Sequence, residues 1–454
     1  MRGGDGLILA AGLAPLAGLG RLNAPPDRPV AVAVSGGGDS LALLLLAKAW
    51  ADLAGRRLIA LTVDHGLQPA SAGWSEAVAA RAARLGVAHW TLAWTGPKPT
   101  TGLPAAARRA RHALLAAAAR DAGAAVILMG HTADDVAEAA AMRAAGSTTP
   151  SPALWSPSPA WPEGRGVFLL RPLLGHRRAD LQAFLAVCGE TWIDDPANDD
   201  LRFARARARR DLGGAAAPDI SPAAVAEPPP ALAEVREGPG GELTIPRATL
   251  GAGAPGERRR LVGALVLCAA GTDRPPAAAA LDRIAARLAG DAPFVATLAG
   301  ARIAAGPDEV LVCREAGERA RGGLAEVRIE RGEAVFDGRF LVRLAGEARV
   351  GPLAGRARQL PPDQRRRLAA MAPAARRALP VVELEGGLSC PVLAPDGSAT
   401  SLVLARFRAA LGAIADEADA LAAMHASSLA DERHAHSDRG GVVARSEINL
   451  GLLN

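Results

Sequence analysis

The feature that most constrains the fold is an apolar, β-branched run that breaks into three consecutive glycines. The run covers residues 30–34, the glycines belong to Ser35-Gly36-Gly37-Gly38-Asp39-Ser40, and an apolar helical pattern over 41–50 follows at once. A strand that turns through glycines into a helix is where an α/β protein holds a phosphate, because glycine lets backbone N–H groups approach the ligand closely. The helix N-terminus adds partial positive charge. The sequence therefore predicts a phosphate-binding loop.

The residues around the glycines indicate which phosphate chemistry the loop serves. A Walker loop reads GxxxxGK[ST] and holds the outer phosphates with its lysine, but the chain's two lysines, Lys48 and Lys98, both lie outside the loop. A dinucleotide loop would read GxGxxG, which the segment also does not match. The SGGGDS segment instead resembles the pyrophosphate-binding loop of the ATP-pyrophosphatase superfamily, whose members cleave ATP between the α and β phosphates.

Composition bounds the class of protein. The 454 residues carry a formal net charge of +5, which is compatible with a nucleic-acid partner and does not require one. The four cysteines are widely spaced without a CxxC pair, which argues against zinc-ribbon, iron–sulfur or thioredoxin-type sites and favours a reduced, cytoplasmic chain. No apolar run reaches the roughly 18–20 residues that span a membrane, and we expect residues 1–20 to form a helix rather than a signal peptide.

Strand and helix patterns alternate from residue 30 to about residue 190. The expected strands are 30–34, 58–63, 89–92, 126–129 and 167–170, and the expected helices are 41–50, 75–85, 104–122, 132–145 and 180–187. Strands that alternate with helices of this length predict an α/β fold with a doubly wound parallel sheet. Ligands of such sheets bind at the carboxyl ends of the strands.

Changes in composition divide the rest of the chain. We expect a catalytic domain over 1–212, an Ala/Pro-rich linker over 213–238, a helical domain over 239–320, a small mixed α+β domain over 321–430 and a flexible tail over 431–454. Within these domains the patterns predict helices over 257–269 and 276–288, a hairpin over 295–314 and one long helix over 402–429.

A second motif follows the fourth expected strand. The segment Gly130-His131-Thr132-Ala133-Asp134-Asp135-Val136-Ala137-Glu138 opens a helix, and Thr132 with Asp135 fits a capping pair. Capping explains only Asp135, not all three acids within one and a half turns. Asp134 and Glu138 are four residues apart, so their charges repel each other and would destabilise the helix. Such a cluster at the carboxyl end of a strand suits Mg²⁺ beside phosphates, or an amino-group ligand.

Taken in order, these motifs resemble the tRNA(Ile)-lysidine synthase family. The resemblance is carried by SGGGDS at 35–40, TVDHGL at 62–67, ARRARH at 107–112, GHTADDVAE at 130–138, RPLL at 171–174, WIDDPANDD at 192–200 and RARAR at 205–209. That family joins L-lysine to C2 of the wobble cytidine in the CAU anticodon of a minor isoleucine tRNA; ATP adenylates the C2 carbonyl, and the lysine amine then displaces AMP. The resemblance covers roughly residues 25–210. It implies a PP-loop fold of the adenine nucleotide alpha hydrolase type and Mg²⁺ as a cofactor, and it leaves a homodimer open.

The resemblance also implies roles for individual residues. ATP would be held by Ser35, Gly36, Gly37, Gly38, Asp39, Ser40, Asp64, His65, Gly130 and His131. Asp39 and Asp135 would hold Mg²⁺, while Glu138 and Arg205 would bind the ammonium and the carboxylate of lysine. Arg108 and Arg111 share one helix face and could hold phosphate or developing charge. The expected catalytic residues are Asp39, Arg108, Asp135, Glu138 and Arg205. A carboxylate such as Glu138 equally suits a base that takes the amine proton, and both roles stay open.

The chain departs from the family pattern at several polar positions, and alternatives remain. Val136 and Ala139 replace the Gln and Thr of HxxDDQxET, and His112 stands where a Tyr is common. A tRNA 2-thiolase commonly uses paired cysteines, which this chain lacks. An amidotransferase or NAD synthetase is disfavoured by the segments at 171–174 and 194–198. A degraded, non-catalytic tRNA-binding homologue is a further alternative, and the lost polar residues are its support. Candidate tRNA contacts are the basic runs 258–260 and 365–367 and the stripe Arg202, Arg205 and Arg209.

Overall fold

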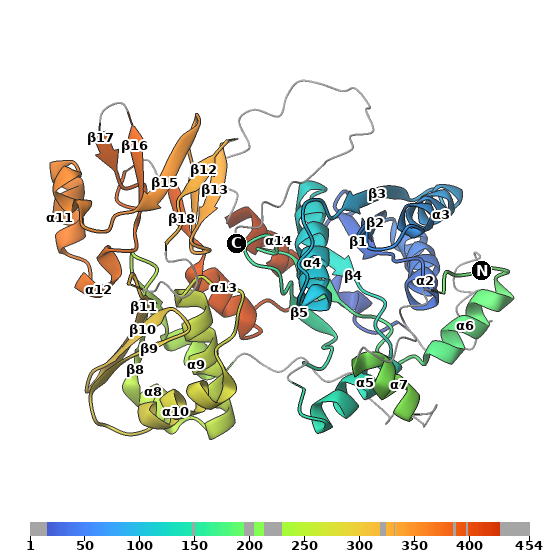
Figure 1. The fold of residues 1–454 in the computed structure, drawn as a ribbon, viewed down its shortest axis with the longest axis horizontal. Coiled ribbons are helices and arrows are strands. Elements are labelled where there is room, and N and C mark those ends of the chain that lie inside the picture. Colours follow the sequence, from blue (N-terminus) through green and yellow to red (C-terminus); the bar gives the residue numbers. More distant parts are fainter. Residues whose placement is uncertain are drawn as a thin grey trace. The chain divides into compact units, whose positions relative to one another are not determined.

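The computed structural model describes residues 16–147, 150–194, 204–212, 229–317, 324–330, 332–384, 387–395 and 398–426. The chain divides into two units (Figure 1). Unit 1 comprises Met1–Ala226 and Ala415–Asn454, and unit 2 comprises Glu227–Ile414. Most of the helix expected over 1–20 and all of the tail expected over 431–454 lie outside the described residues. Among the described residues, no helix combines the length and apolar character needed to cross a bilayer.

Unit 1 is built on a six-stranded sheet with the strand order β3-β2-β1-β4-β6-β5. The strands are β1 (Pro29–Ala33), β2 (Arg57–Asp64), β3 (Ala88–Ala93), β4 (Val126–Leu128), β5 (Trp155–Pro157) and β6 (Phe168–Leu170). All neighbours pair in parallel except β5, which runs antiparallel to β6 at the edge. The predicted α/β fold with a mostly parallel sheet is confirmed. Only β5 was not expected, because it lies in a segment rich in Ser and Pro.

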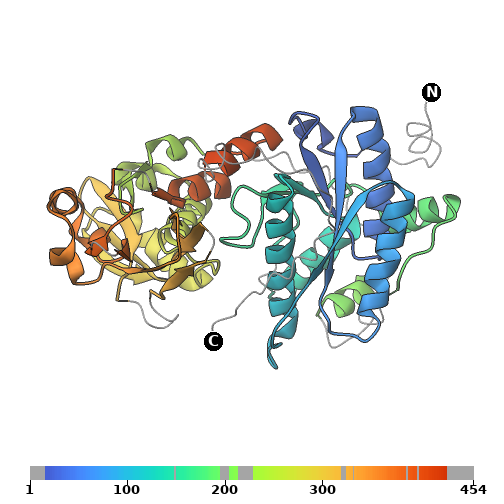
Figure 2. The ribbon, with the colours of Figure 1, turned by 90° about the horizontal axis from the view of Figure 1, so that it is seen from above.

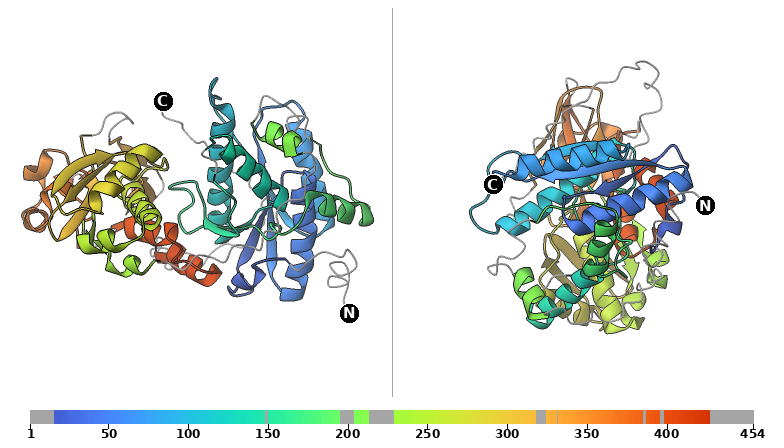
Figure 3. Two further views of the ribbon diagram at one scale, coloured as in Figure 1. Left: turned by 90° about the horizontal axis from the view of Figure 1, so that it is seen from below. Right: turned by 90° about the vertical axis from the view of Figure 1, so that its right-hand side faces the viewer.

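Helices cover both faces of this sheet. The helices of unit 1 are α2 (Gly38–Ala54), α3 (Ser71–Arg84), α4 (Leu103–Asp121), α5 (Ala133–Ala144), α6 (Arg178–Val187), α7 (Ala204–Leu212) and α14 (Glu417–Ala426), with a short 3₁₀ turn, η1 (Leu19–Arg21). Figures 1 and 2 show α4 on one face and α2 and α3 on the other, and Figure 3 gives two further views. Because helices cover both faces of the sheet, Val30, Ala31 and Val32 of the central strand β1 are completely buried. This explains why the sequence of β1 is a continuous apolar run.

The direction of winding reverses between β1 and β4, which are neighbours at the centre of the sheet. The glycine loop follows β1 and the acidic motif follows β4. Gly130 packs closely against the start of α2, because a Cβ at this position would lie 3.1 Å from backbone atoms of Asp39 and Ser40. The topology therefore brings both motifs together at the position where doubly wound sheets bind ligands.

The end of the chain completes unit 1. Glu417, at the start of α14, is fully buried, and its carboxylate pairs with the guanidinium of Arg56 at 2.8 Å. Arg56 also donates to the carbonyl oxygens of Leu22 and Arg28 at 3.2 and 3.1 Å, and the backbone N–H of Ala24 donates to Glu417 at 3.1 Å. This ion pair and its hydrogen bonds anchor α14 to the first strands of unit 1.

The single helix predicted over 402–429 is wrong. The structure has two helices there, α13 (Val403–Ala410) in unit 2 and α14 in unit 1. The break coincides with Gly412, whose φ of 90° lies in the left-handed region that ends helices. Apolar residues on both sides of the break hid it in the sequence pattern.

Unit 2 combines helices with antiparallel sheets. Its first sheet has the order β7-β8-β11-β10-β9, made of β7 (Arg236–Glu237), β8 (Leu243–Pro246), β9 (Phe294–Leu298), β10 (Ala301–Ala305) and β11 (Glu309–Arg314). A second sheet contains β12 (Val327–Ile329), β15 (Ala348–Pro352), β16 (Pro380–Leu384) and β17 (Gly387–Ser389), and a third contains β13 (Glu333–Phe336), β14 (Phe340–Arg343) and β18 (Ala399–Ser401). The helices are α8 (Arg247–Ala252), α9 (Pro255–Ala269), α10 (Ala278–Leu288), α11 (Pro362–Ala369), α12 (Pro373–Arg376) and α13, with the 3₁₀ turns η3 (Pro230–Glu234) and η4 (Arg356–Gln359).

The described part of unit 2 contains more strands than the sequence patterns predicted. The region expected to be helical, 239–320, also carries β8 to β11, and the expected hairpin over 295–314 is three strands. Phe407 of α13 is buried in the same core as α9, whereas buried residues between Ile329 and Leu393 form a second core. Arg314 and Arg339 also share the carboxylate of Asp337, at 3.0 and 2.8 Å. Of the expected linker, 213–228 lies outside the described residues, while η3 and β7 belong to unit 2.

Candidate functional site

The glycine loop is held in shape by its own serines. The Ser40 hydroxyl accepts the Ser35 backbone N–H at 3.1 Å and donates to the Gly37 carbonyl at 2.9 Å, and the two serine hydroxyls lie 3.1 Å apart. Helix α2 begins at Gly38 with Asp39 in its first turn. The first N–H groups of a helix have no acceptor inside it, so this loop presents donors suited to phosphate oxygens.

A segment that comes after α6 in the sequence covers the loop. The Ile193 N–H donates to the Gly36 carbonyl at 3.0 Å, and a Cβ on Gly36 would lie 2.6 Å from the Ile193 side chain. A Cβ on Gly38 would contact Trp192 at 3.5 Å. Gly36 also has a φ of 90°, so both its conformation and its surroundings require glycine. The rest of the motif, 195–200, lies outside the described residues.

One arginine joins the acids of both motifs. The Arg178 guanidinium lies 3.0 Å from Asp39, 3.5 Å from Asp135 and 3.4 Å from Glu138. Burial alone would lower the pKa of Arg178, but the three carboxylates together raise it above its ordinary value. Burial raises the pKa of Asp39, against the opposing effect of Arg178. Arg178 therefore acts as a shared counter-charge for three of the predicted site residues.

Two further arginines reach the same acids from α7, which packs beside α5 (Figure 1). Arg205 Nε lies 2.7 Å from one Glu138 oxygen and Arg209 Nε lies 2.9 Å from the other. Arg205 also contacts Asp135. The two residues predicted to bind lysine, Glu138 and Arg205, are thus brought together and are paired with each other.

The acidic cluster is compensated by partners distant in sequence. Asp135 accepts the Thr132 N–H at 2.7 Å, so the predicted capping pair is present, while its other oxygen faces the arginines. Asp134 accepts the Arg178 backbone N–H at 2.7 Å. Since every acid has a donor from another segment, the repulsion expected between Asp134 and Glu138 is offset within the fold.

The carboxylates of Asp39 and Asp135 suit Mg²⁺ in their chemistry. Proteins usually hold this ion through one or two carboxylates together with substrate phosphates, and Arg178 draws these two carboxylates around one cationic group. The described residues contain no group of three or more His, Cys, Asp or Glu side chains arranged to hold a metal alone. The pair therefore fits an ion that arrives with a phosphate ligand.

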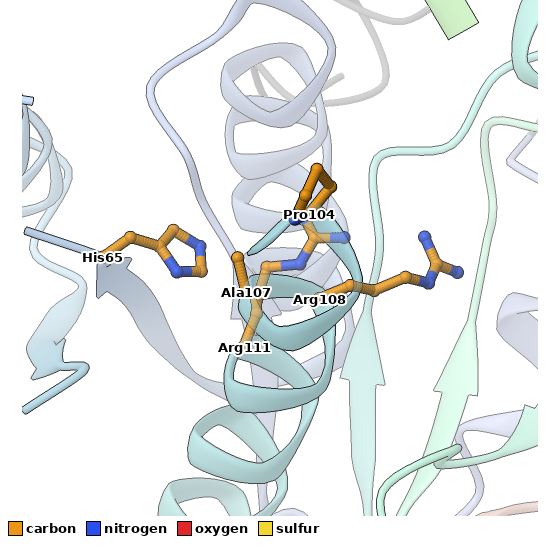
Figure 4. Close-up of a pocket in the computed structure, with 5 residues that line it drawn as sticks. All are labelled: His65, Pro104, Ala107, Arg108 and Arg111. Carbon is orange, nitrogen blue, oxygen red and sulfur yellow. The ribbon is translucent and has the colours of Figure 1, made fainter. Parts of the chain in front are cut away.

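A separate pocket lies between the end of β2 and helix α4. It has a cavity volume of about 240 Å³ and is lined by His65, Pro104, Ala107, Arg108 and Arg111. In the view of Figure 4, the guanidinium of Arg111 lies between His65 and the guanidinium of Arg108. Positive charge thus gathers on this side of the site.

Electrostatics links this pocket to Arg205 and His131. Burial, followed by the charges of Arg108 and Arg205, lowers the pKa of Arg111 to about 10. Burial and the surrounding arginines also hold the pKa of His131 well below its usual range. Asp64 stands apart from the acids, because its carboxylate accepts the Gly66 N–H at 2.8 Å in a turn. The predicted site residues therefore form an acidic side and a basic side, with Arg205 near both.

Sequence reasoning missed Arg178, the residue with the most contacts in the acidic network. It is the first residue of α6 and follows Arg177, and the chain uses arginine almost everywhere in place of lysine. An arginine at a helix start therefore carried no signal. Arg209 was considered only as a tRNA contact, whereas the structure pairs it with Glu138.

Comparison with known proteins adds to this geometry. Residues 18–216 match the family description of a PP-loop domain. The chain is similar to the tRNA(Ile)-lysidine synthase of Caulobacter vibrioides, with 49% identity over 410 residues that cover 87% of this chain and 96% of the relative. It is similar to that of Hyphomonas neptunium, with 40% identity covering 70% of this chain and 90% of the relative. The Methylobacterium nodulans protein of the same name is 39% identical over 71% of this chain and 84% of its own length.

Proposed function

The chain belongs to the tRNA(Ile)-lysidine synthase family, and we propose on this basis that it ligates L-lysine to C2 of the wobble cytidine in the CAU anticodon of a minor isoleucine tRNA. The reaction consumes ATP, passes through an adenylated tRNA and releases AMP and pyrophosphate. The observation that carries the proposal is the meeting of the glycine loop with Asp39, Asp135 and Glu138 at the switch point of a PP-loop sheet. The enzyme is a ligase that forms a carbon–nitrogen bond.

The first step, adenylation of the tRNA, requires residues that bind the pyrophosphate leaving group. The C2 oxygen forms a bond to the α-phosphorus, the bond from that phosphorus to the bridging oxygen breaks, and pyrophosphate leaves with the electron pair. Donors of the glycine loop, with Ser35 and Ser40, would hold the pyrophosphate, since stabilising such developing charge is usually the largest catalytic effect. When bound, Mg²⁺ would be held by Asp39 and Asp135 and would supply positive charge against the phosphates.

The second step needs an aligned, neutral amine. The lysine nitrogen forms a bond to C2, AMP leaves with the oxygen, and the amine loses a proton. Glu138 would hold an ammonium group or take that proton, and Arg205 would pair with the lysine carboxylate. Because Arg205 and Arg209 already donate to Glu138, a lysine ammonium would replace one of these guanidiniums. Asp64, His65, Gly130 and His131 would face the adenosine side.

Incubation with minor isoleucine tRNA, ATP and labelled lysine tests the proposal directly. We expect label in the tRNA and equal amounts of AMP and pyrophosphate. AMP release that needs tRNA but incorporates no lysine would favour another adenylating enzyme. Tight tRNA binding with no ATP cleavage would favour the non-catalytic homologue.

Replacing Glu138 with Gln should impair the use of lysine more than the adenylation of tRNA. The carboxylate is buried and charged partners surround it, and losing a charge-assisted contact of this kind costs about 1.5–3 kcal/mol, or about 10- to 100-fold in the lysine concentration needed. Steady-state lysine titration and tRNA-dependent ATP–pyrophosphate exchange measure the two steps. Glu76→Gln, at an exposed carboxylate of α3, is the control. Equal loss of both steps would point to a role in ATP binding instead.

We propose that unit 2 contributes to tRNA binding through exposed arginines. Most of the expected basic runs serve the fold: Arg258 donates to the carbonyls of Gly251 and Gly253, Arg260 to that of Leu411, Arg365 to that of Leu360 and Arg367 to that of Leu393. Arg366 is exposed and has no hydrogen-bond or ion-pair partner among the described residues. It is the member of these runs best placed to contact phosphate.

Arg366→Ala should weaken binding to all tRNAs alike, because phosphate contacts position RNA without specifying its sequence. One lost contact should lower the slope of log affinity against log salt by roughly 0.7–0.9. Arg328→Ala is the control, since that guanidinium is already paired with Glu347 at 2.8 Å. An unchanged slope in the Arg366 variant would move the proposed tRNA contacts away from α11.

A further inference from the structure

Helix α3 holds the segment 190–194, which covers the glycine loop, through an arginine outside the acidic network. Arg81 Nε lies 3.2 Å from the Glu190 carboxylate, and the same guanidinium donates to the carbonyl of Thr191 and, at 3.1 Å, to its hydroxyl. Arg81 lies in the last turn of α3, where a basic residue complements the helix dipole without needing any partner. Its contacts with two consecutive residues of another segment give it a second role.

Two arginines of α3 reach Glu190, but only one of them is shielded from solvent. Arg84 donates to the same carboxylate at 3.3 Å, yet its side chain is 61% exposed, whereas those of Arg81 and Glu190 are 13% and 22% exposed. Water and salt screen an exposed ion pair, so it contributes little. We therefore expect Arg81 to fix the position of the segment, and Arg84 offers a comparison within the same helix.

The residues that Arg81 fixes lie just ahead of those that touch the glycine loop. The Ile193 N–H donates to the Gly36 carbonyl at 3.0 Å. Because a peptide group is planar and trans, the N–H of Gly37 points the opposite way, away from Ile193. This N–H has no acceptor among the described residues, and a phosphate oxygen would supply one. The hydrogen bond from Ile193 thus orients one of the donors of the loop.

The same helix also packs directly against the loop. A Cβ on Gly36 would lie 3.3 Å from the Val78 side chain as well as 2.6 Å from that of Ile193, and Val78 is almost completely buried. Val78 and Arg81 are three residues apart and therefore share one face of α3. This face supports the glycine loop through Val78 and fixes the covering segment through Arg81.

We propose that Arg81 is a positioning residue for nucleotide binding. By fixing residues 190–191 it holds Ile193 against the glycine loop, and it thereby sets the affinity of the loop for the pyrophosphate portion of ATP. The proposal rests on the proposed function only in naming ATP as the ligand.

Binding of an uncleavable nucleotide tests the proposal without turnover. The probe is α,β-methylene ATP with Mg²⁺, and calorimetric titration of the full chain measures its Kd. Arg81→Met should raise this Kd about 5- to 10-fold, the range of effects passed between residues in contact. Arg84→Met removes the same charge from the next turn and the same carboxylate, and it should change the Kd less than about twofold.

A double-mutant cycle tests the route through Ile193. If Arg81 acts through the covering segment, Arg81→Met should raise the Kd less than about twofold when Ile193→Ala is already present. Circular dichroism confirms folding. If Arg81→Met fails to fold, Arg81→Lys carries the same test, because lysine keeps the charge but cannot make the forked contact with both residues. It should raise the Kd about threefold or more.

Steady-state kinetics separates positioning from a loss of folded protein. Weaker ground-state binding raises the KM for ATP and leaves kcat unchanged, whereas partial unfolding lowers kcat at an unchanged KM. We expect Arg81→Met to raise the KM for ATP in step with the Kd. An unchanged Kd, equal effects of Arg81→Met and Arg84→Met, or a loss confined to kcat would overturn the proposal. An Arg81 effect on the analogue in a chain that makes no lysidine would contradict the proposed function alone.

Discussion

Asp39→Asn should reduce tRNA-dependent AMP release about 100-fold or more, the scale seen when one key electrostatic contact of a transition state is lost. Asp39 stands in the first turn of α2, beside the donors of the glycine loop, and is one of the two carboxylates proposed to hold Mg²⁺. Asparagine keeps its size and leaves Arg178 its contacts with Asp135 and Glu138. Release of labelled AMP from ATP, with and without tRNA, measures the effect.

Asp52→Asn is the matched control, because Asp52 lies on the same helix and pairs at the surface with Lys48. It should leave AMP release unchanged. If Asp39→Asn released AMP at a near-normal rate, Asp39 would only stabilise the start of helix α2 through its negative charge. ADP and phosphate as products would contradict cleavage between the α and β phosphates, and with it the role of the glycine loop.

Glu417→Gln should destabilise unit 1 by about 3–5 kcal/mol, because removing one partner of a buried ion pair leaves an uncompensated charge. Glu417 is fully buried, and Arg56 is nearly so. All seven tryptophans, from Trp50 to Trp192, belong to unit 1. Tryptophan fluorescence during urea unfolding therefore reports this unit alone, and its midpoint should fall with an unchanged slope.

The exposed Asp419 of the same helix provides the control, and Asp419→Asn should cost less than about 1 kcal/mol. The double variant Arg56→Met, Glu417→Leu should recover much of the lost stability, because a well-packed apolar pair commonly replaces a buried ion pair at little cost. If Glu417→Gln leaves the unfolding of unit 1 unchanged, α14 is not part of its stabilising core. The same contacts mean that a fragment ending near residue 213 would lack the partner of Arg56.

The central sheet and both motifs could be predicted from the sequence, because each is marked by a pattern within a few consecutive residues. Apolar β-branched runs predict buried parallel strands, and a glycine triplet or an acidic helix start is legible in a few residues. Strand β5 and the break at Gly412 were hidden, since a Ser/Pro-rich edge strand and an apolar helix end have weak local patterns. The role of Arg178 depends on contacts with residues about 40 and 139 positions earlier. No local pattern encodes such pairing in a chain so rich in arginine.

The buried pair in unit 1 also sets an order of events during synthesis. Arg56 and Glu417 are separated by 361 positions, and at about 5–20 residues per second a ribosome takes about 20–70 s to pass from one to the other. All of unit 2 is translated within that interval, so its cores can form before Glu417 has been synthesised and can pair with Arg56. Unit 1 is thus the first to leave the ribosome and the last to be complete.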